Sequence, residues 1–327
     1  MEGGIEKQNS TITFKNQPKL SGDPVDKKRD ELRVALVPHV ERFVATDEFF
    51  KGQEVTVEFS EQGVSSLVSF IETRGEKFVL KIPLNDIGSA GSEALFLKTW
   101  ESAGISTPHI FKEGMFDTNP YLLMQYIDEP TVQEKYKEND EGRENLFFEA
   151  GKILRAMHRP EAVGFGRVAN GKGEYNTFPE WLNSADMEKR ERYIEDHQLL
   201  SGEHGSISQA KDTLLHFVGE NTKSSYLHFD YSTGHLFATE PLTVFDPDPL
   251  FNHRYIDLGR TFVNYIAQTG AYPKKLLEGY CEGEEIDEKA LHAAIFINIV
   301  YKIPYQHQKG REKVVKNFQN YLLQHKF

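Results

Sequence analysis

The most informative part of this chain reads LHFDYSTGHLF at residues 227–237 and VFDPDPLFNHRYIDLG at residues 244–259. His and Asp side chains gather there at the edges of short apolar, strand-like runs. Because Pro247 and Pro249 have no N–H for a ladder bond, the strand before them must end. Asp246 therefore lies where a strand opens into a loop, a common position for a metal-binding carboxylate. The alternative for such an Asp is that it only caps a turn.

The segments that precede this stretch predict a small sheet followed by a larger helical part. Three β-branched and aromatic runs separated by glycine turns predict an antiparallel meander: VTVEF at 55–59, SSLVSFI at 65–71 and KFVLKI at 77–82. A helical pattern follows at 93–103, and YLLMQYI at 121–127 reads as a buried strand.

These patterns predict an α+β protein with two unequal lobes. We expect a flexible N-terminal arm at residues 1–24 and an N-lobe with a small antiparallel β-sheet at residues 25–127. A larger, mainly helical C-lobe follows at residues 128–327.

The order of these segments resembles the aminoglycoside phosphotransferase and choline kinase-like family, which has the two-lobed protein-kinase-like fold. His228 and Asp230, followed by His235 and Asp246 five and sixteen residues after Asp230, are similar to the family's H-x-D-x4-N and D-x-x catalytic segment. Lys81 stands near the end of the third strand, as the phosphate-binding lysine of a kinase does. The likeness continues through the helix that begins near Glu93, the strand at 121–127 and the segment AGKILRAMH, and it runs from about residue 59 to residue 259.

The resemblance implies a small-molecule kinase that transfers the γ-phosphate of ATP or GTP to a hydroxyl group. Phosphoryl transfer depends mainly on positioning and charge neutralisation. Asp230 would accept the proton of the acceptor hydroxyl or orient that hydroxyl. Lys81 would hold the nucleotide phosphates, and Glu93 would fix Lys81 by an ion pair.

The remaining site residues implied by the resemblance bind nucleotide and metal. The turn that ends in Ser65 and Ser66 would cover the phosphates with backbone N–H groups, and the nucleotide base would contact Gln125 and Ile127 between the lobes. Asp246 and His235 would hold Mg²⁺. His235 departs from the family pattern, which has Asn there, and Mg²⁺ prefers oxygen ligands to imidazole.

The composition of the chain limits the classes of molecule that it is expected to bind. The 327 residues carry 38 Lys and Arg against 50 Asp and Glu, a formal net charge of −12. This charge opposes binding to nucleic acid or to anionic membranes, which need neutralising cations. A small and cationic acceptor, such as an aminoglycoside or amino sugar, fits the charge better.

The cysteine count and the N-terminal residues bear on the kinds of cross-link and metal site the protein can have and on its cellular location. Cys281 is the single cysteine, which excludes an intrachain disulfide and every zinc site built on two or more thiolates. The first residues show no signal-peptide pattern, so we expect a cytoplasmic protein, either a monomer or a homodimer.

Two other interpretations stay open. The first is a non-catalytic or degenerate nucleotide-binding protein on the same fold, suggested by His235. The second is a metal-dependent hydrolase, whose ligands would come from a set of His and Asp residues: His228, Asp230, His235, Asp246 and His253.

Overall fold

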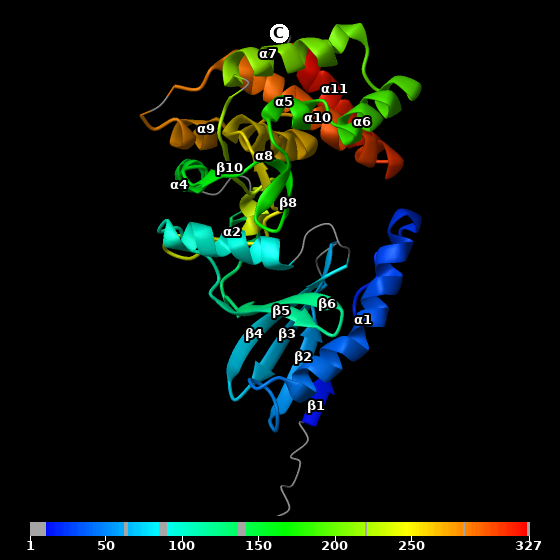
Figure 1. The fold of residues 1–327 in the computed structure, drawn as a ribbon, viewed down its shortest axis with the longest axis vertical. Coiled ribbons are helices and arrows are strands. Elements are labelled where there is room, and N and C mark those ends of the chain that lie inside the picture. The colour runs from blue at the N-terminus through cyan, green and yellow to red at the C-terminus, as the bar shows by residue number, and fades with distance from the viewer. Residues whose placement is uncertain are drawn as a thin grey trace, which may run out of the picture. The chain divides into compact units, whose positions relative to one another are not determined.

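The computed structural model describes residues 11–61, 65–84, 90–136, 142–219, 221–283 and 285–325. The chain forms two compact units (Figure 1). The N-terminal unit comprises Met1–Ala94 and Pro108–Asp128, and the C-terminal unit comprises Leu95–Thr107 and Glu129–Phe327. The predicted α+β fold, with a small antiparallel sheet before a larger helical part, is confirmed.

The division between the units differs from the predicted lobes in one segment. Residues 95–107 belong to the C-terminal unit although they were expected in the N-lobe. Helix α2 (Ala90–Ser102) buries Phe96 against Phe251 and stacks Trp100 on His228, and both partners lie in the C-terminal unit. The helical pattern is thus correct, but its second half packs with residues far along the chain.

The N-terminal unit contains a six-stranded sheet with the strand order β1-β2-β3-β4-β6-β5. The strands are β1 (Thr11–Phe14), β2 (Glu54–Phe59), β3 (Ser66–Thr73), β4 (Glu76–Pro83), β5 (Ile110–Phe116) and β6 (Asn119–Gln125). Strands β2, β3 and β4 form the predicted antiparallel meander. Strand β5, which pairs with β6, was not predicted.

Strand β1 corrects the expectation of a flexible arm over residues 1–24. Residues 11–14 pair in parallel with β2, and Ile12 and Phe14 pack on the core of the unit. The alternating Thr-Ile-Thr-Phe pattern suits a strand. A run of four residues between polar segments is too short a pattern to predict one. Residues 1–10 lie outside the described part of the chain.

Helix α1 (Lys27–Thr46) packs against one face of this sheet (Figure 1). The chain is capped before α1, because the Asp23 side chain accepts a hydrogen bond from Val25 N at the 3₁₀ turn η1 (Pro24–Asp26) that precedes the helix. Phe78, Leu80 and Ile82 of β4 are buried in the core of the unit. Since side chains alternate along a strand, Lys81 points to the opposite face.

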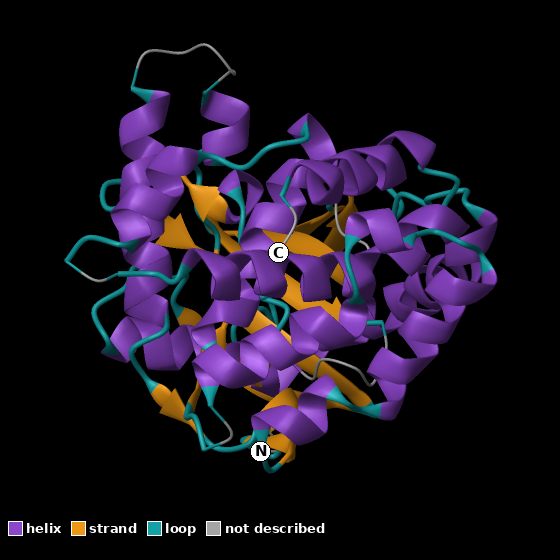
Figure 2. Cartoon of the chain, turned by 90° about the horizontal axis from the view of Figure 1, so that it is seen from above, coloured by secondary structure: helices purple, strands orange, loops and turns teal. Residues whose placement is uncertain are grey.

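The C-terminal unit is mainly helical, as predicted, with two small sheets (Figure 2). Its other helices are α3 (Val132–Lys135), α4 (Arg143–Met157), α5 (Phe178–Leu182), α6 (Ala185–Asp196), α7 (Ile207–Val218), α8 (Arg254–Thr269), α9 (Lys274–Tyr280), α10 (Glu288–Gln308) and α11 (Glu312–Gln324), with 3₁₀ turns η2 (Gly202–His204) and η3 (Thr233–His235). One sheet has the order β7-β10-β13-β8-β9, and β11 pairs with β12 in the other. The strands are β7 (Glu161–Ala162), β8 (Phe165–Ala169), β9 (Lys172–Tyr175), β10 (Ser224–Leu227), β11 (Leu236–Phe237), β12 (Thr243–Val244) and β13 (Leu250–Asn252).

Helices α4 and α9 cross at two glycines. A Cβ added to Gly151 would overlap the carbonyl oxygen of Leu276, and one added to Gly279 would overlap that of Phe148. Only glycine allows backbones to approach this closely. The crossing places the end of α9, with Tyr280, beside the end of α4, with His158.

Among the described residues, no helix is long and apolar enough to cross a bilayer.

We expect Gly151→Ala to lower the free energy of unfolding by about 1–3 kcal/mol, because the added methyl group must push two backbones apart. Urea unfolding of the variant checks this. The control is Gly202→Ala, since an added Cβ at Gly202 meets no atom within 4 Å. Equal stabilities of the two variants would contradict the close crossing.

Candidate active site

In the N-terminal unit, β4 and the first turn of α2 hold a buried ion pair. Lys81 Nζ lies 2.6 Å from Glu93 Oε2, and the two side chains are only 8% and 7% exposed. The structure thus brings these two predicted residues together. Burying two charges costs desolvation energy, and a hydrophobic pair would often be as stable. An ammonium group held this way suits a binding role better than a purely structural one.

The other predicted nucleotide-binding residues lie at strand ends of the same unit. Ser65 is exposed, and its carbonyl oxygen accepts a hydrogen bond from Leu84 N at 2.9 Å. Ser66 is the first residue of β3 and is buried. The turn between them and Glu61 includes residues 62–64, which lie outside the described residues.

Gln125 ends β6, and Ile127 follows that strand. The N–H of Gln125 donates to His109 O at 2.8 Å, which fixes the backbone at this point. A pocket of 130 Å³ in this unit is lined in part by Tyr126, the residue between Gln125 and Ile127. Its lining does not include Gln125, Ile127 or Lys81. This volume is smaller than the roughly 300 Å³ at which small-molecule sites begin, so the pocket alone is not a nucleotide site.

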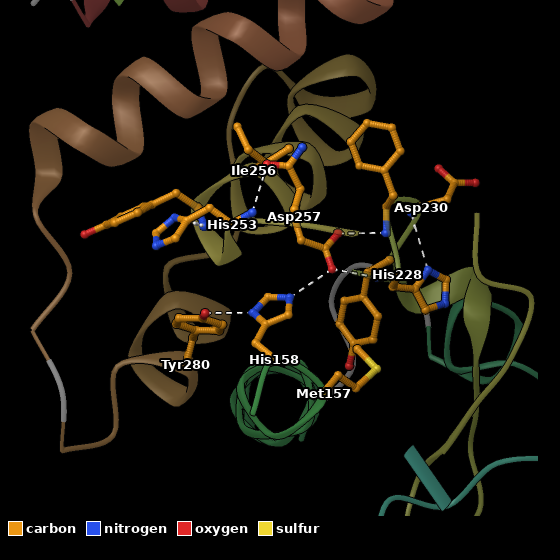
Figure 3. A network of polar contacts seen from close by, with 12 residues as sticks. Met157, His158, His228, Asp230, His253, Ile256, Asp257 and Tyr280 are labelled. Carbon is orange, nitrogen blue, oxygen red and sulfur yellow. Dashed lines mark hydrogen bonds and ion pairs between the residues drawn. The ribbon is translucent and has the colours of Figure 1, made fainter. Parts of the chain in front are cut away.

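In the C-terminal unit, the loop that carries Asp230 is anchored on a buried carboxylate (Figure 3). Asp257, in the first turn of α8, accepts hydrogen bonds from His228 N at 2.7 Å and from Phe229 N at 2.8 Å. Phe229 has a φ of 58°, a left-handed conformation that is unfavourable for a phenylalanine. The carboxylate therefore holds the residue before Asp230 in a strained conformation.

His158 completes this anchor from the end of α4 (Figure 3). Its Nε2 donates to Asp257 Oδ2 at 2.9 Å, and its Nδ1 lies 2.8 Å from the Tyr280 hydroxyl. His158 is thus hydrogen-bonded through both ring nitrogens, to a carboxylate at Nε2 and to a hydroxyl at Nδ1. The close crossing of α4 and α9 thus supports the loop through two side chains.

His228 braces the loop through both nitrogens of its ring. Its Nε2 donates to Phe245 O at 3.0 Å, and its Nδ1 accepts from Asp230 N at 3.4 Å. Burial, with a further contribution from the neighbouring His235, lowers the pKa of His228. The ring is therefore neutral at pH 7, which its acceptor role at Nδ1 requires.

Asp230 presents its side chain beside this braced backbone. The carboxylate is 43% exposed. The carbonyl oxygen of Asp230 accepts a hydrogen bond of 2.6 Å from His235 Nδ1. The loop is thus fixed on both sides of a partly exposed carboxylate, as a base that must reach a substrate requires.

The structure also brings His235 and Asp246 together. Because His235 Nδ1 donates to Asp230 O, the other ring nitrogen, Nε2, is the one that can offer a lone pair to a metal, and it lies 4.0 Å from Asp246 Oδ2. Asp246 follows β12 with a left-handed φ of 55°. Two electron-pair donors that face each other at this distance fit a cation held by both, so the residues present suit a metal site.

The ligand set proposed for a hydrolase is not assembled. Within the described ranges, no group of three or more His, Cys, Asp or Glu side chains could hold a metal. His253 instead caps α8 by accepting a hydrogen bond from Tyr255 N, and burial lowers its pKa to about 3. Mg²⁺ needs only one or two carboxylates together with substrate phosphates, which two facing ligands can satisfy.

Sequence reasoning missed two residues beside Asp230. Asn264 Nδ2 donates to Asp230 Oδ1 at 3.2 Å, and Lys302 Nζ donates to Asn264 Oδ1. Burial lowers the pKa of Lys302 to about 7. The available signal was the spacing of Asn264 seven residues after Asp257, which places both on one face of a helix.

Comparisons with known proteins identify a family for the chain. The family model described as "Phosphotransferase enzyme family" (APH) matches residues 56–292, more than half of the chain. No curated protein sequence matches the chain.

Solved structures share the fold at low sequence identity. A thermostable mutant of aminoglycoside phosphotransferase APH(4)-Ia, in a ternary complex with AMP-PNP and hygromycin B, matches with a TM-score of 0.63 and 14% identity, covering 86% of this chain and 96% of its own. A candidate fructosamine-3-kinase from Thermobifida fusca has a TM-score of 0.56 and 20% identity, with coverages of 84% and 96%. Spectinomycin phosphotransferase APH(9)-Ia, in complex with ADP and spectinomycin, has a TM-score of 0.54 and 15% identity, with coverages of 86% and 93%.

Proposed function

The chain belongs to the phosphotransferase enzyme family, and from this premise we propose that it transfers the γ-phosphate of ATP to a hydroxyl group of a small molecule. The observation that carries the proposal is the buried Lys81–Glu93 ion pair at 2.6 Å. Kinases use such a pair to position an ammonium group for the phosphates of the nucleotide, which supports this role for Lys81. Structures of similar fold contain AMP-PNP or ADP, which favours ATP over GTP as the donor.

Asp230 is the base of the proposed reaction. Its carboxylate would accept the proton of the acceptor hydroxyl or orient that hydroxyl for attack. The braced backbone of residues 228–230 keeps the carboxylate in place while the substrates change. Asp246 and His235 would hold the metal, which would neutralise charge on the nucleotide phosphates when it is bound.

The acceptor is proposed to be small and positively charged, such as an aminoglycoside or amino sugar. The support for a cationic acceptor is the net charge of −12. Some acidic residues have other roles, since Glu180 caps α5 and Asp186 pairs with Arg190 at 3.0 Å. The acceptor screen therefore includes uncharged compounds.

The test of the function is a nucleotide-dependent phosphorylation screen over aminoglycosides, amino sugars, choline-like amines, ketosamines and uncharged sugars, run with ATP and with GTP. Transfer to a cationic member with ATP is the expected result. Nucleotide binding without transfer to any acceptor would favour the non-catalytic alternative. No binding of either nucleotide would count against both.

We expect Lys81→Ala to reduce the rise in melting temperature that MgATP causes, because the phosphates lose a cation. Lys51→Ala, at an exposed lysine of the same unit, is the control. Because Glu93 would lose this ion pair, the double variant Lys81→Met/Glu93→Gln removes both charges and keeps the site neutral. An undiminished thermal shift in both Lys81 variants would exclude phosphate binding by Lys81.

We expect Asp230→Asn to lower the turnover number by at least about 100-fold, since an amide cannot accept the hydroxyl proton. Nucleotide binding, measured by calorimetry, should stay within about twofold of the wild-type value. Asp212→Asn, at an exposed position on α7, should leave both quantities unchanged. Wild-type turnover in the Asp230 variant would remove this residue from its role.

We expect His235→Asn to change metal preference, because it replaces an imidazole with an amide oxygen. Calorimetry of AMP-PNP binding in Mg²⁺ and in Mn²⁺ measures this without catalysis. The affinity with Mg²⁺ should rise by about 10-fold and the advantage of Mn²⁺ should fall. An unchanged ratio between the two metals would show that His235 does not bind the metal.

A further inference from the structure

The carboxylate of Asp230 is tied to helix α8 by the amide of Asn264. Asn264 Nδ2 lies 3.2 Å from Asp230 Oδ1 and 3.4 Å from Tyr231 O. The Asn264 side chain is buried, so solvent does not compete strongly for this amide. One donor group therefore links the side chain of the proposed base to the backbone of the next residue. Asp230 Oδ2 lies 3.9 Å from His235 Nδ1, beyond hydrogen-bond distance, and is the oxygen that the proposed function assigns to the acceptor hydroxyl.

Lys302 determines which way the Asn264 amide points. Its ammonium group donates to Asn264 Oδ1. In its protonated form the Lys302 side chain has donors only, and a carboxylate has acceptors only. A rotated amide would bring its NH₂ against the ammonium and its oxygen against the carboxylate, so both contacts would become repulsive. The NH₂ group is therefore held toward Asp230.

Two tightly packed helices keep these groups aligned. Helix α8 holds the loop at two points on one face, at Asp257 and at Asn264. Helix α10 is bound to α8 one turn before Lys302, where Asn298 Nδ2 donates to Ile256 O at 2.9 Å. A Cβ added to Gly259 of α8 would lie 2.7 Å from the backbone of Ala294 on α10. Little sliding between the helices is possible at this spacing.

The charges around Lys302 favour a role in the site over simple surface solvation. Burial, with a contribution from Arg260, lowers its pKa to about 7, while Asp230 opposes that shift and Arg311 adds to it. In the part of the chain that the structure describes, no carboxylate forms an ion pair with Lys302. Its nearest negative group is reached through the Asn264 amide.

We infer that Asn264 is a positioning residue for the carboxylate of Asp230, and that Lys302 acts through Asn264 by fixing the orientation of its amide. The inference rests on the proposed function of Asp230 as the base. Neither residue touches the nucleotide in this role, so nucleotide affinity should not depend on them.

The first test ranks two substitutions of Asn264 by turnover. Asn264→Ala removes the donor, and we expect the turnover number to fall by about 10- to 100-fold with the nucleotide KM unchanged. Asn264→Asp keeps the size of the side chain but sets a second carboxylate against Asp230, and we expect a larger loss. If Asn264 only filled space, the Asp variant would be the more active of the two, and that order would overturn the inference.

The second test is a double-mutant cycle. Lys302→Met should lower turnover by about 10-fold in the wild-type background, and Lys302→Arg, which keeps a donor, should restore part of it. In the Asn264→Ala background, Lys302→Met should have no further effect, because there is no amide left to orient. Additive losses would show that Lys302 acts independently of Asn264.

A crystal structure of the Asn264→Ala variant separates this inference from the proposed function. Thermal unfolding first confirms that the variant is folded. If the wild-type protein transfers phosphate to no acceptor, the proposed function fails, but the position of the Asp230 carboxylate can still be compared. We expect that carboxylate to rotate or to occupy two conformers in the variant. A single, unchanged conformer would overturn the inference.

Discussion

The C-terminal unit depends on one buried carboxylate, that of Asp257. It accepts two backbone N–H groups of the loop and the imidazole of His158, so its charge is compensated by three donors. A buried carboxylate without such donors would be very unfavourable. If the loop moved away, Asp257 would lose two of its three hydrogen-bond donors. The strained backbone at Phe229 and the direction of Asp230 follow from this constraint.

The hydrogen bonds around Asp230 hold its backbone groups and one oxygen of its carboxylate and, among the described residues, leave the other oxygen without such a bond. Its N–H and carbonyl oxygen are held by His228 and His235, and one carboxylate oxygen is held by Asn264. Its other carboxylate oxygen is the one available for chemistry. The same bond to His235 leaves that ring's second nitrogen facing Asp246, so the proposed base and the proposed metal site share one arrangement of hydrogen bonds.

The sequence predicted those parts of the site that lie close together along the chain. The meander is a local pattern of the sequence. The Lys81–Glu93 pair and the segment from His228 to Asp246 were expected because motifs in the same order along the chain resemble the phosphotransferase family. Asn264 and Lys302 meet only because α8 packs on α10. The spacing of apolar residues within one helix does not indicate which other helix it packs against. The same reason explains why residues 95–107 were placed in the wrong unit, and the short strand β1 had too few residues to stand out.

The first strand also matters for anyone who shortens this protein for expression. Strand β1 covers an edge of the sheet by pairing with β2, whereas the family match begins at residue 56. A fragment cut to the family boundary would lose β1 and α1 together. It would then present an unprotected strand edge and an uncovered apolar face, which are the features that drive chains to aggregate. Strand β1 and helix α1, which precede the family match, therefore cover surfaces of the unit that the shorter fragment would expose.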